Sequence, residues 1–139
     1  MTLEVKSREN LEIAEYCLDG KVAISSGVSR AYYAAYQMAK GYLIRNGVSD
    51  SNYAAKANDW KVEIGYPVRK FAHESIWKLV KAHMRVTRKS GDGLKIAGLG
   101  ESLHRERTAA DYTERDFSAD RLASCIKQAK GLIIALSEE

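Results

Sequence analysis

Three side chains able to take part in proton transfer or phosphate binding recur at helical spacing near the end of the chain. His104, Arg107 and Asp111 are separated by three and four residues, so they share one face of a helix. Arg107 also follows the apolar spacing of Leu103 and Ala110. An arginine directed into a packed surface is unfavourable unless it is paired or faces a partner or a wet cleft. The pattern therefore predicts either a functional site or a buried Arg107–Asp111 salt bridge.

Apolar residues at helical spacing predict the elements that would position these side chains. Together they indicate one all-α domain over residues 1–139, an up-and-down bundle of four to five helices. Gly20 is expected to end the first helix, and Ser51 to cap a short one. The five main predicted helices span residues 7–19, 21–46, 67 to about 83, a segment ending near 112, and 119–139. The short helix is expected over residues 51–60.

Residues 84–100 depart from this helical pattern, because they contain four glycines that follow a short stretch rich in basic residues. Glycine favours turns and loops, so the segment is expected to be a flexible loop. It can serve as a basic flap beside a cleft or as a plain connection. It is not a phosphate-binding P-loop, because no Gly-Lys-Ser/Thr closes it and no strand precedes it.

The second predicted helix has two contrasting faces. A polar stripe of Ser26, Arg30, Tyr33 and Gln37 is expected to be solvated surface, an interface or a nucleic-acid contact. The opposite, apolar face is expected to be buried, with three alanines that let a neighbouring helix approach closely. Its residues are Val28, Ala31, Tyr32, Ala35, Ala39, Tyr42 and Leu43.

The helix expected to begin at Pro67 carries a row of Arg69, His73 and Trp77 along its flank. His73 can be either a hydrogen-bonded structural histidine or part of a site. The buried side of this helix is expected to consist of Val68, Phe71, Ala72, Ile76, Leu79, Val80 and His83.

Charge is distributed unevenly along the chain, whose formal net charge is +4. Residues 1–20 carry five acidic against two basic side chains, whereas residues 61–91 carry eight basic against two acidic ones. The basic excess is compatible with a phosphate-bearing partner and equally with a solvated helix face. Neither a membrane-spanning segment nor the apolar core of a secretion signal is present in the sequence, so we expect a cytoplasmic protein. Cys17 and Cys125 are expected to be buried reduced thiols, and we expect no metal and no cofactor.

Two segments together resemble the HEPN domain family. Ser29-Arg-Ala-Tyr-Tyr-Ala-Ala-Tyr36 lies on the second predicted helix, and Arg107-Thr-Ala-Ala-Asp-Tyr112 precedes a closing amphipathic helix. The likeness is to small stand-alone HEPN proteins often encoded beside a minimal nucleotidyltransferase, and it covers most of the chain. It implies a helical bundle that forms a homodimer, a role in toxin–antitoxin or phage-defence modules, and metal-independent ribonuclease activity in many members.

The chain departs from the hallmark of that family, an arginine followed after four to six residues by a histidine. No histidine follows Arg107 at that distance, and Arg69 and His73 are only four positions apart. Metal-free RNA cleavage needs a base, an acid and a cation at the phosphate. Arg107 can supply the cation, and His104 can exchange a proton.

Three hypotheses follow. The first is a HEPN-like partner or RNA- or nucleotide-binding protein with a degenerate cleavage motif, acting through a dimer cleft. The second is an active endoribonuclease that uses Arg107 and His104, with Asp111 as a positioning group; the third is a structural helical subunit. Expected partners are a second copy, RNA, and a nucleotidyltransferase or other defence protein, with no membrane. The expected binding residues are Arg30, Tyr33, Arg69, His73, Tyr112, Arg85, Arg88 and Lys89.

Overall fold

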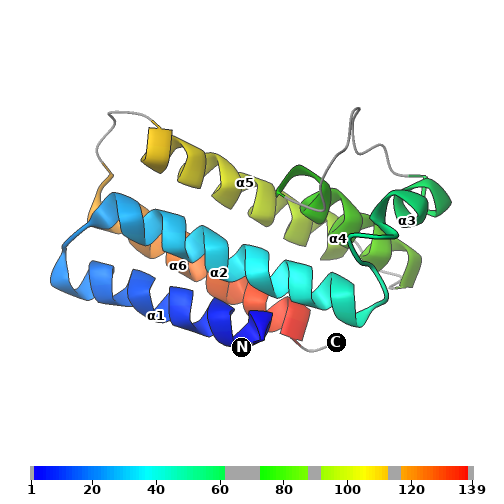
Figure 1. The fold of residues 1–139 in the computed structure, drawn as a ribbon. Helices are drawn as coiled ribbons and strands as arrows, with labels where there is room; N and C mark the ends of the chain where they lie inside the picture. Colours follow the sequence, from blue (N-terminus) through cyan, green and yellow to red (C-terminus); the bar gives the residue numbers. More distant parts are fainter. Residues whose placement is uncertain (1, 62–72, 88–91, 113–116, 138–139) are drawn as a thin grey trace.

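A computed structural model describes residues 2–61, 73–87, 92–112 and 117–137. Within these ranges the chain forms a helical bundle without strands, as the sequence predicts (Figure 1). The described residues contain six helices rather than four to five. They are α1 (Leu3–Gly20), α2 (Ile24–Arg45), α3 (Tyr53–Asp59), α4 (His73–Thr87), α5 (Asp92–Tyr112) and α6 (Ala119–Ser137).

Helix α2 is the centre of the bundle and contacts α1, α4, α5 and α6. Its predicted apolar face is confirmed, since every residue of that face is fully buried. Small residues allow the close approaches that this central position requires. A Cβ atom built on Gly27 would lie 2.8 Å from a methyl group of Leu122 and 3.0 Å from the Cβ of Cys17. The sequence therefore places α2 correctly at the core.

Helix α1 is longer than predicted and ends differently. Thr2 caps its N-terminus, where the side-chain oxygen accepts from the backbone N–H of Val5 at 3.2 Å, the usual role of threonine at this position. Gly20 is the last helical residue, and Lys21 adopts the left-handed conformation (φ 51°) that ends the helix. The prediction that Gly20 stops the helix is thus displaced by one residue. After α2, by contrast, Gly47 takes the expected left-handed position (φ 87°).

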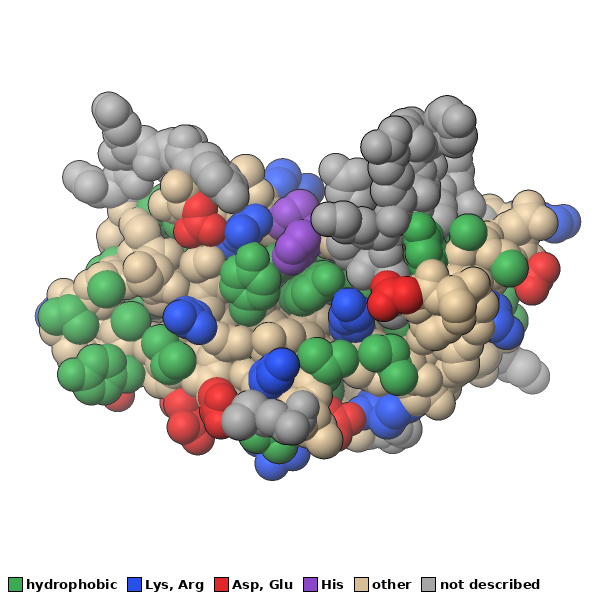
Figure 2. All heavy atoms as spheres, viewed as in Figure 1, with side chains coloured by type: hydrophobic (Ala, Val, Ile, Leu, Met, Phe, Trp, Pro, Cys, Tyr) green, Lys and Arg blue, Asp and Glu red, His purple; other side chains and the backbone are tan. Residues whose placement is uncertain are grey.

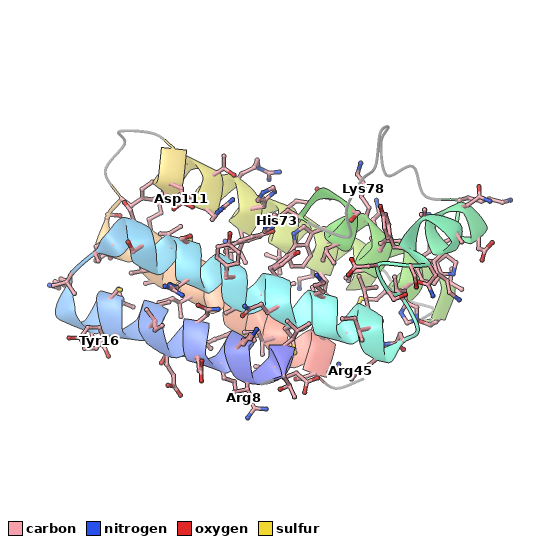
Figure 3. The ribbon with its side chains drawn as sticks, in the orientation of Figure 1. Arg8, Tyr16, Arg45, His73, Lys78 and Asp111 are labelled. Atoms are coloured by element: carbon pink, nitrogen blue, oxygen red, sulfur yellow. The ribbon has the colours of Figure 1, made fainter. Side chains whose placement is uncertain are left out.

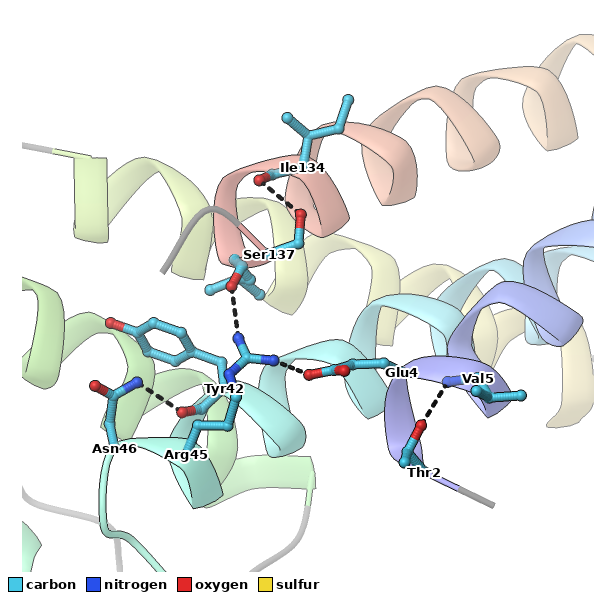
Figure 4. Close-up of polar contacts among 9 residues, drawn as sticks. Thr2, Glu4, Val5, Tyr42, Arg45, Asn46, Ile134 and Ser137 are labelled. Atoms are coloured by element: carbon cyan, nitrogen blue, oxygen red, sulfur yellow. Dashed lines mark hydrogen bonds and ion pairs between the residues drawn. The ribbon is translucent and has the colours of Figure 1, made fainter.

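One end of the bundle is tied together by Arg45 of α2 (Figure 4). Its guanidinium forms an ion pair with Glu4 of α1. It also donates to the backbone carbonyl of Leu136 at 3.0 Å, near the end of α6. Cations at the C-terminal end of a helix are favoured because its last carbonyls lack partners within the helix. Arg45 therefore joins three helices through polar contacts at the rim of the apolar core.

The prediction of a flexible loop over residues 84–100 is wrong for the described part. Residues 84–87 belong to α4 and residues 92–100 to α5. Ile96, Ala97, Gly100 and Leu103 are buried at a helical spacing, so the glycine-rich segment is amphipathic. Gly100 permits close packing, because a Cβ built there would lie 2.2 Å from the Trp77 ring. Packing against α4 therefore outweighs the weak helix propensity of glycine here.

Helix α4 begins, within the described residues, at His73; the predicted start at Pro67 lies outside them. Ile76, Leu79, Val80 and His83 are buried as predicted, whereas Val68, Phe71 and Ala72 lie outside the described residues. Trp77, which was predicted on the flank of this helix beside His73, is only 1% exposed. Its ring packs directly against Gly100 of α5, and Arg69 lies outside the described residues.

Two tyrosine–histidine pairs join α2 to α4 in a common register. The Tyr32 Oη lies 2.7 Å from Nδ1 of His73, and the Tyr42 Oη lies 2.6 Å from Nδ1 of His83. Because both partners advance by ten residues in the same direction, α4 runs parallel to α2. Ten helical residues correspond to about 15 Å along the axis. The two pairs therefore fix the position of α4 on α2 at two separate levels.

The remaining predictions about local structure have mixed outcomes. Asn52, not Ser51, precedes α3, and its side chain contacts Ser49 N and Gly47 O instead of capping the helix. Both cysteines are free and buried, as predicted. The described helices include none that is long and apolar enough to cross a membrane.

Candidate functional site

The predicted site residues His104, Arg107 and Asp111 lie in order along α5, and Arg107 contacts Tyr33 of α2. Figure 3 labels Asp111 of α5 and His73 of α4. His73, at the described start of α4, joins them through its contact with Tyr32. Histidine side chains gather at the surface here, next to arginine or lysine side chains and an acidic residue (Figure 2). We call the group contributed by α2, α4 and α5 the His–Arg cluster. It consists of Tyr32, Tyr33, Tyr36, His73, His104 and Arg107.

A chain of hydrogen bonds sets the protonation of His73. The indole N–H of Trp77 can only donate, and it lies 3.4 Å from the Tyr32 Oη. We assign the Tyr32 hydroxyl as the donor in its 2.7 Å contact with Nδ1 of His73, because this fully buried hydroxyl already accepts from Trp77 and needs an acceptor for its own proton. The single proton of a neutral His73 ring is thereby placed on Nε2. His73 consequently presents an N–H donor rather than a basic nitrogen to the site.

Burial keeps both members of this pair uncharged. It raises the pKa of Tyr32 well above its usual range, so the hydroxyl keeps its proton. Burial also lowers the pKa of His73 from 6.5 to about 4, and the neighbouring charges of His104, Arg107 and Lys40 act in the same direction. At neutral pH His73 is therefore a neutral hydrogen-bond donor.

Aromatic rings hold the two histidines against each other. The His73 and His104 rings are almost parallel (14°), with centroids 5.3 Å apart. His104 also stacks on Tyr32 at 5.1 Å, and His73 lies 4.4 Å from the ring of Tyr36. These contacts restrict the rotation of both imidazoles. The two histidines come from the consecutive helices α4 and α5 and form one partly exposed surface.

Arg107 links the histidines to Asp111. Its Nε lies 2.9 Å from Oδ2 of Asp111, and its Nη2 donates to the Tyr33 Oη at 2.9 Å. The guanidinium carbon lies 5.2 Å from the centre of the Tyr33 ring, within the range of a cation–π interaction. The side chain is 15% exposed. The predicted salt bridge is therefore formed, and it lies at the edge of the His–Arg cluster.

A cavity of about 360 Å³ adjoins the cluster. It is lined by Ser26, Ser29, Arg30, Tyr33 and Asp111, and we call it the Ser26–Asp111 pocket. The Ser29 hydroxyl donates to Oδ2 of Asp111 at 3.3 Å, and Arg30 donates to the side-chain oxygen of Asn10 at 3.0 Å. The polar stripe predicted on this face of α2 therefore borders a pocket. Tyr33 and Asp111 belong both to the pocket and to the contacts of Arg107.

Other predicted binding residues lie elsewhere or outside the described residues. Arg85 donates to the backbone carbonyl of Trp60 at 3.0 Å, beside α3 and apart from the cluster. Arg69, Arg88 and Lys89 lie outside the described residues, as does the side chain of Tyr112. A second cavity of about 470 Å³ lies at the Arg45 end of the bundle. Two arginines line it, Arg8 and Arg45, and Arg45 is already engaged by Glu4 and a backbone carbonyl.

Sequence reasoning missed several members of the site. Tyr32 was assigned to the apolar core, because its position in the helical pattern does not show that its hydroxyl contacts His73. Tyr36, Trp77 and Ser29 were not proposed as site residues. The run Tyr32-Tyr33-Ala-Ala-Tyr36 was a usable signal, because consecutive tyrosines on a helix reach two adjacent faces.

The lowered pKa of His73 predicts a pH-dependent stability. The unfolded chain protonates this histidine near its ordinary pKa of 6.5, whereas the folded chain does so only near pH 4. Between these values the unfolded state binds more protons, so the free energy of unfolding should fall as the pH falls from about 6.5 to 4. Urea denaturation at several pH values measures this. The decline should be shallower in His73→Gln, and equal slopes for both proteins would contradict the assignment.

The described residues contain no group of three or more metal-ligating side chains. Comparison of the chain with protein-family models, curated proteins and solved structures found no match.

Proposed function

We propose that the His–Arg cluster binds a phosphate group of RNA or of a nucleotide, in a HEPN-like protein of the toxin–antitoxin or phage-defence kind. The observation that carries the proposal is the contact of His73 and His104 beside Arg107. These side chains offer an Nε2–H donor, a second imidazole and a permanent cation. The charge-assisted N–H donors of an arginine are usual ligands of phosphate oxygens, and the neutral N–H of His73 can add a further hydrogen bond.

Two further features support the HEPN-like part of the proposal. The segments that carry the resemblance, residues 29–36 and 107–112, contact each other through Tyr33 and Arg107. Both lie in a helical bundle. A homodimer with α5 near the interface, and a nucleotidyltransferase or other defence protein as a further partner, belong to the same proposal.

The state of His73 favours binding over cleavage. A general base must accept a proton near neutral pH. The Nδ1 of His73 already accepts from Tyr32, and its pKa of about 4 keeps its protonated form rare. His73 therefore suits the binding of a phosphate oxygen and does not suit proton transfer. This agrees with a degenerate cleavage motif.

Endoribonuclease activity is the second candidate, because His104 stacks on His73 one helical turn from Arg107. In this mechanism His104 takes the proton of the ribose 2′-OH, and the 2′ oxygen attacks phosphorus. The 5′ oxygen leaves and is protonated by water, while Arg107 neutralises the additional negative charge. The reaction would need only one titrating imidazole, and it would be slower than one with a separate acid.

Binding of a fluorescent oligouridylate, followed by anisotropy, tests the main proposal. We expect saturable binding that weakens between about 50 and 200 mM salt, because phosphate contacts release counterions. Lack of binding at the lower salt concentration would overturn the proposal.

Incubation of the same RNA with EDTA distinguishes the two candidates. A binding protein leaves the RNA intact, and its expression does not stop bacterial growth. An endoribonuclease cleaves the RNA, and His104→Ala abolishes this cleavage. Ser124→Ala, on the exposed surface of α6, is the matched control.

A further inference from the structure

We propose that the Ser26–Asp111 pocket holds the ribose of the nucleotide whose phosphate occupies the His–Arg cluster, so that the protein prefers RNA to DNA. This inference rests on the proposed function and extends it to the part of the ligand that is recognised. Ribose and deoxyribose differ only in the 2′-hydroxyl, a group that both donates and accepts hydrogen bonds.

The pocket presents hydroxyl and carboxylate groups from two helices. Four of the lining residues share one face of α2, because three of them lie three, four and seven positions after the first. They are Ser26, Ser29, Arg30 and Tyr33. Asp111 faces them from α5 and accepts from the Ser29 hydroxyl. A carboxylate is a common partner of ribose hydroxyls in nucleotide sites. The lining also includes the Arg30 guanidinium, so one positive and one negative side chain balance and the pocket suits a neutral polyol.

Asp111 retains acceptor capacity for such a ligand. A carboxylate accepts about four hydrogen bonds, and the contacts of Asp111 with Arg107 and Ser29 both use Oδ2. Its side chain is 29% exposed. A ribose hydroxyl can donate to this carboxylate without displacing Arg107.

Charge separates the two ends of the combined site. Asp111 repels a phosphate from the pocket, while the permanent positive charge of Arg107 attracts it one helical turn away. One turn is about 5.4 Å, which suits a phosphate and its adjoining ribose. The pocket volume of about 360 Å³ lies at the lower end of the range for small-molecule sites. The order of charges along α5 thus orients the nucleotide.

Paired oligonucleotides test the inference. A short oligouridylate and its 2′-deoxy counterpart differ only in the group in question. We expect the protein to bind the ribo form about 10-fold more tightly, as for one hydrogen bond to a charged group. Asp111→Asn should reduce this ratio to below about threefold. Ser26→Ala should reduce the ratio partly. This variant is expected to fold, because Ser26 lies exposed on the surface of α2.

The ratio separates a recognition role from a structural one, since general damage weakens both ligands equally. Ser124→Ala serves as the control and should leave the ratio unchanged, and circular dichroism verifies the folding of each variant. Equal affinity of the native protein for both oligonucleotides would overturn the ribose inference but not phosphate binding. A ratio that survives in both Asp111→Asn and Ser26→Ala would also overturn it. Absence of binding to either oligonucleotide would overturn the proposed function itself.

Discussion

Replacement of Arg107 by alanine should weaken oligouridylate binding by about 10- to 100-fold, the effect of removing a charge-assisted contact to phosphate. Arg107 is the permanent cation of the His–Arg cluster, and Tyr33 and Asp111 hold its guanidinium in position. Anisotropy titrations at one salt concentration measure the change. The slope of affinity against salt concentration should also become shallower, because one phosphate contact is lost.

Two matched variants make this result specific. Arg105→Ala removes an exposed arginine from the same helix, and it should change affinity by less than about threefold. Arg107→Lys keeps the charge but loses the planar donor geometry, so we expect an intermediate affinity. If Arg105→Ala and Arg107→Ala weakened binding equally, the contact would be a diffuse electrostatic one, and the cluster would not be the phosphate site.

Replacement of Gly100 by alanine should destabilise the fold by about 2 kcal/mol or more, as expected for overpacking of a buried contact. The added Cβ would lie 2.2–2.5 Å from three carbon atoms of the Trp77 ring. Trp77 is 1% exposed, so its ring cannot move away without disturbing the core. Urea denaturation of the native and variant proteins measures the difference in the free energy of unfolding.

Gly98 provides the opposite case two residues away. No atom lies within 4 Å of a Cβ built there, and the residue is exposed on α5. Gly98→Ala should therefore stabilise the protein by about 0.5–1 kcal/mol through helix propensity alone. Stabilisation by Gly100→Ala as well would show that α4 and α5 do not pack as closely as described.

The fold could be predicted where one apolar face dominates a segment. The apolar pattern of α2 identified its buried residues, because burial on one side leaves a periodic pattern. Residues 92–100 were misread as part of a loop because the segment 84–100 contains four glycines. The same stretch also carries apolar residues at helical spacing, and the need to accommodate the Trp77 ring explains its glycine at position 100. A local pattern does not reveal which distant ring a small residue must accommodate.

The candidate site could be predicted in part for the same reason. His104, Arg107 and Asp111 share one helix, so spacing alone placed them together. Spacing cannot bring His73 of α4 to Tyr32 of α2, because that contact depends on the tertiary arrangement. Spacing also gives no protonation state. The neutral form of His73 arises from burial and from neighbouring charges on α5 and α2, at His104, Arg107 and Lys40.

The two hydrogen-bonded pairs Tyr32–His73 and Tyr42–His83 restrict the movement of α4 along α2. Sliding α4 along α2 would break both bonds together, including the Tyr42–His83 bond in the protein interior. The position of the His73 imidazole along the α2 axis is therefore fixed before a ligand binds, because both hydrogen bonds hold α4 in place. Little ordering entropy should be lost at this helix on binding. The binding site is therefore preorganised before the ligand binds.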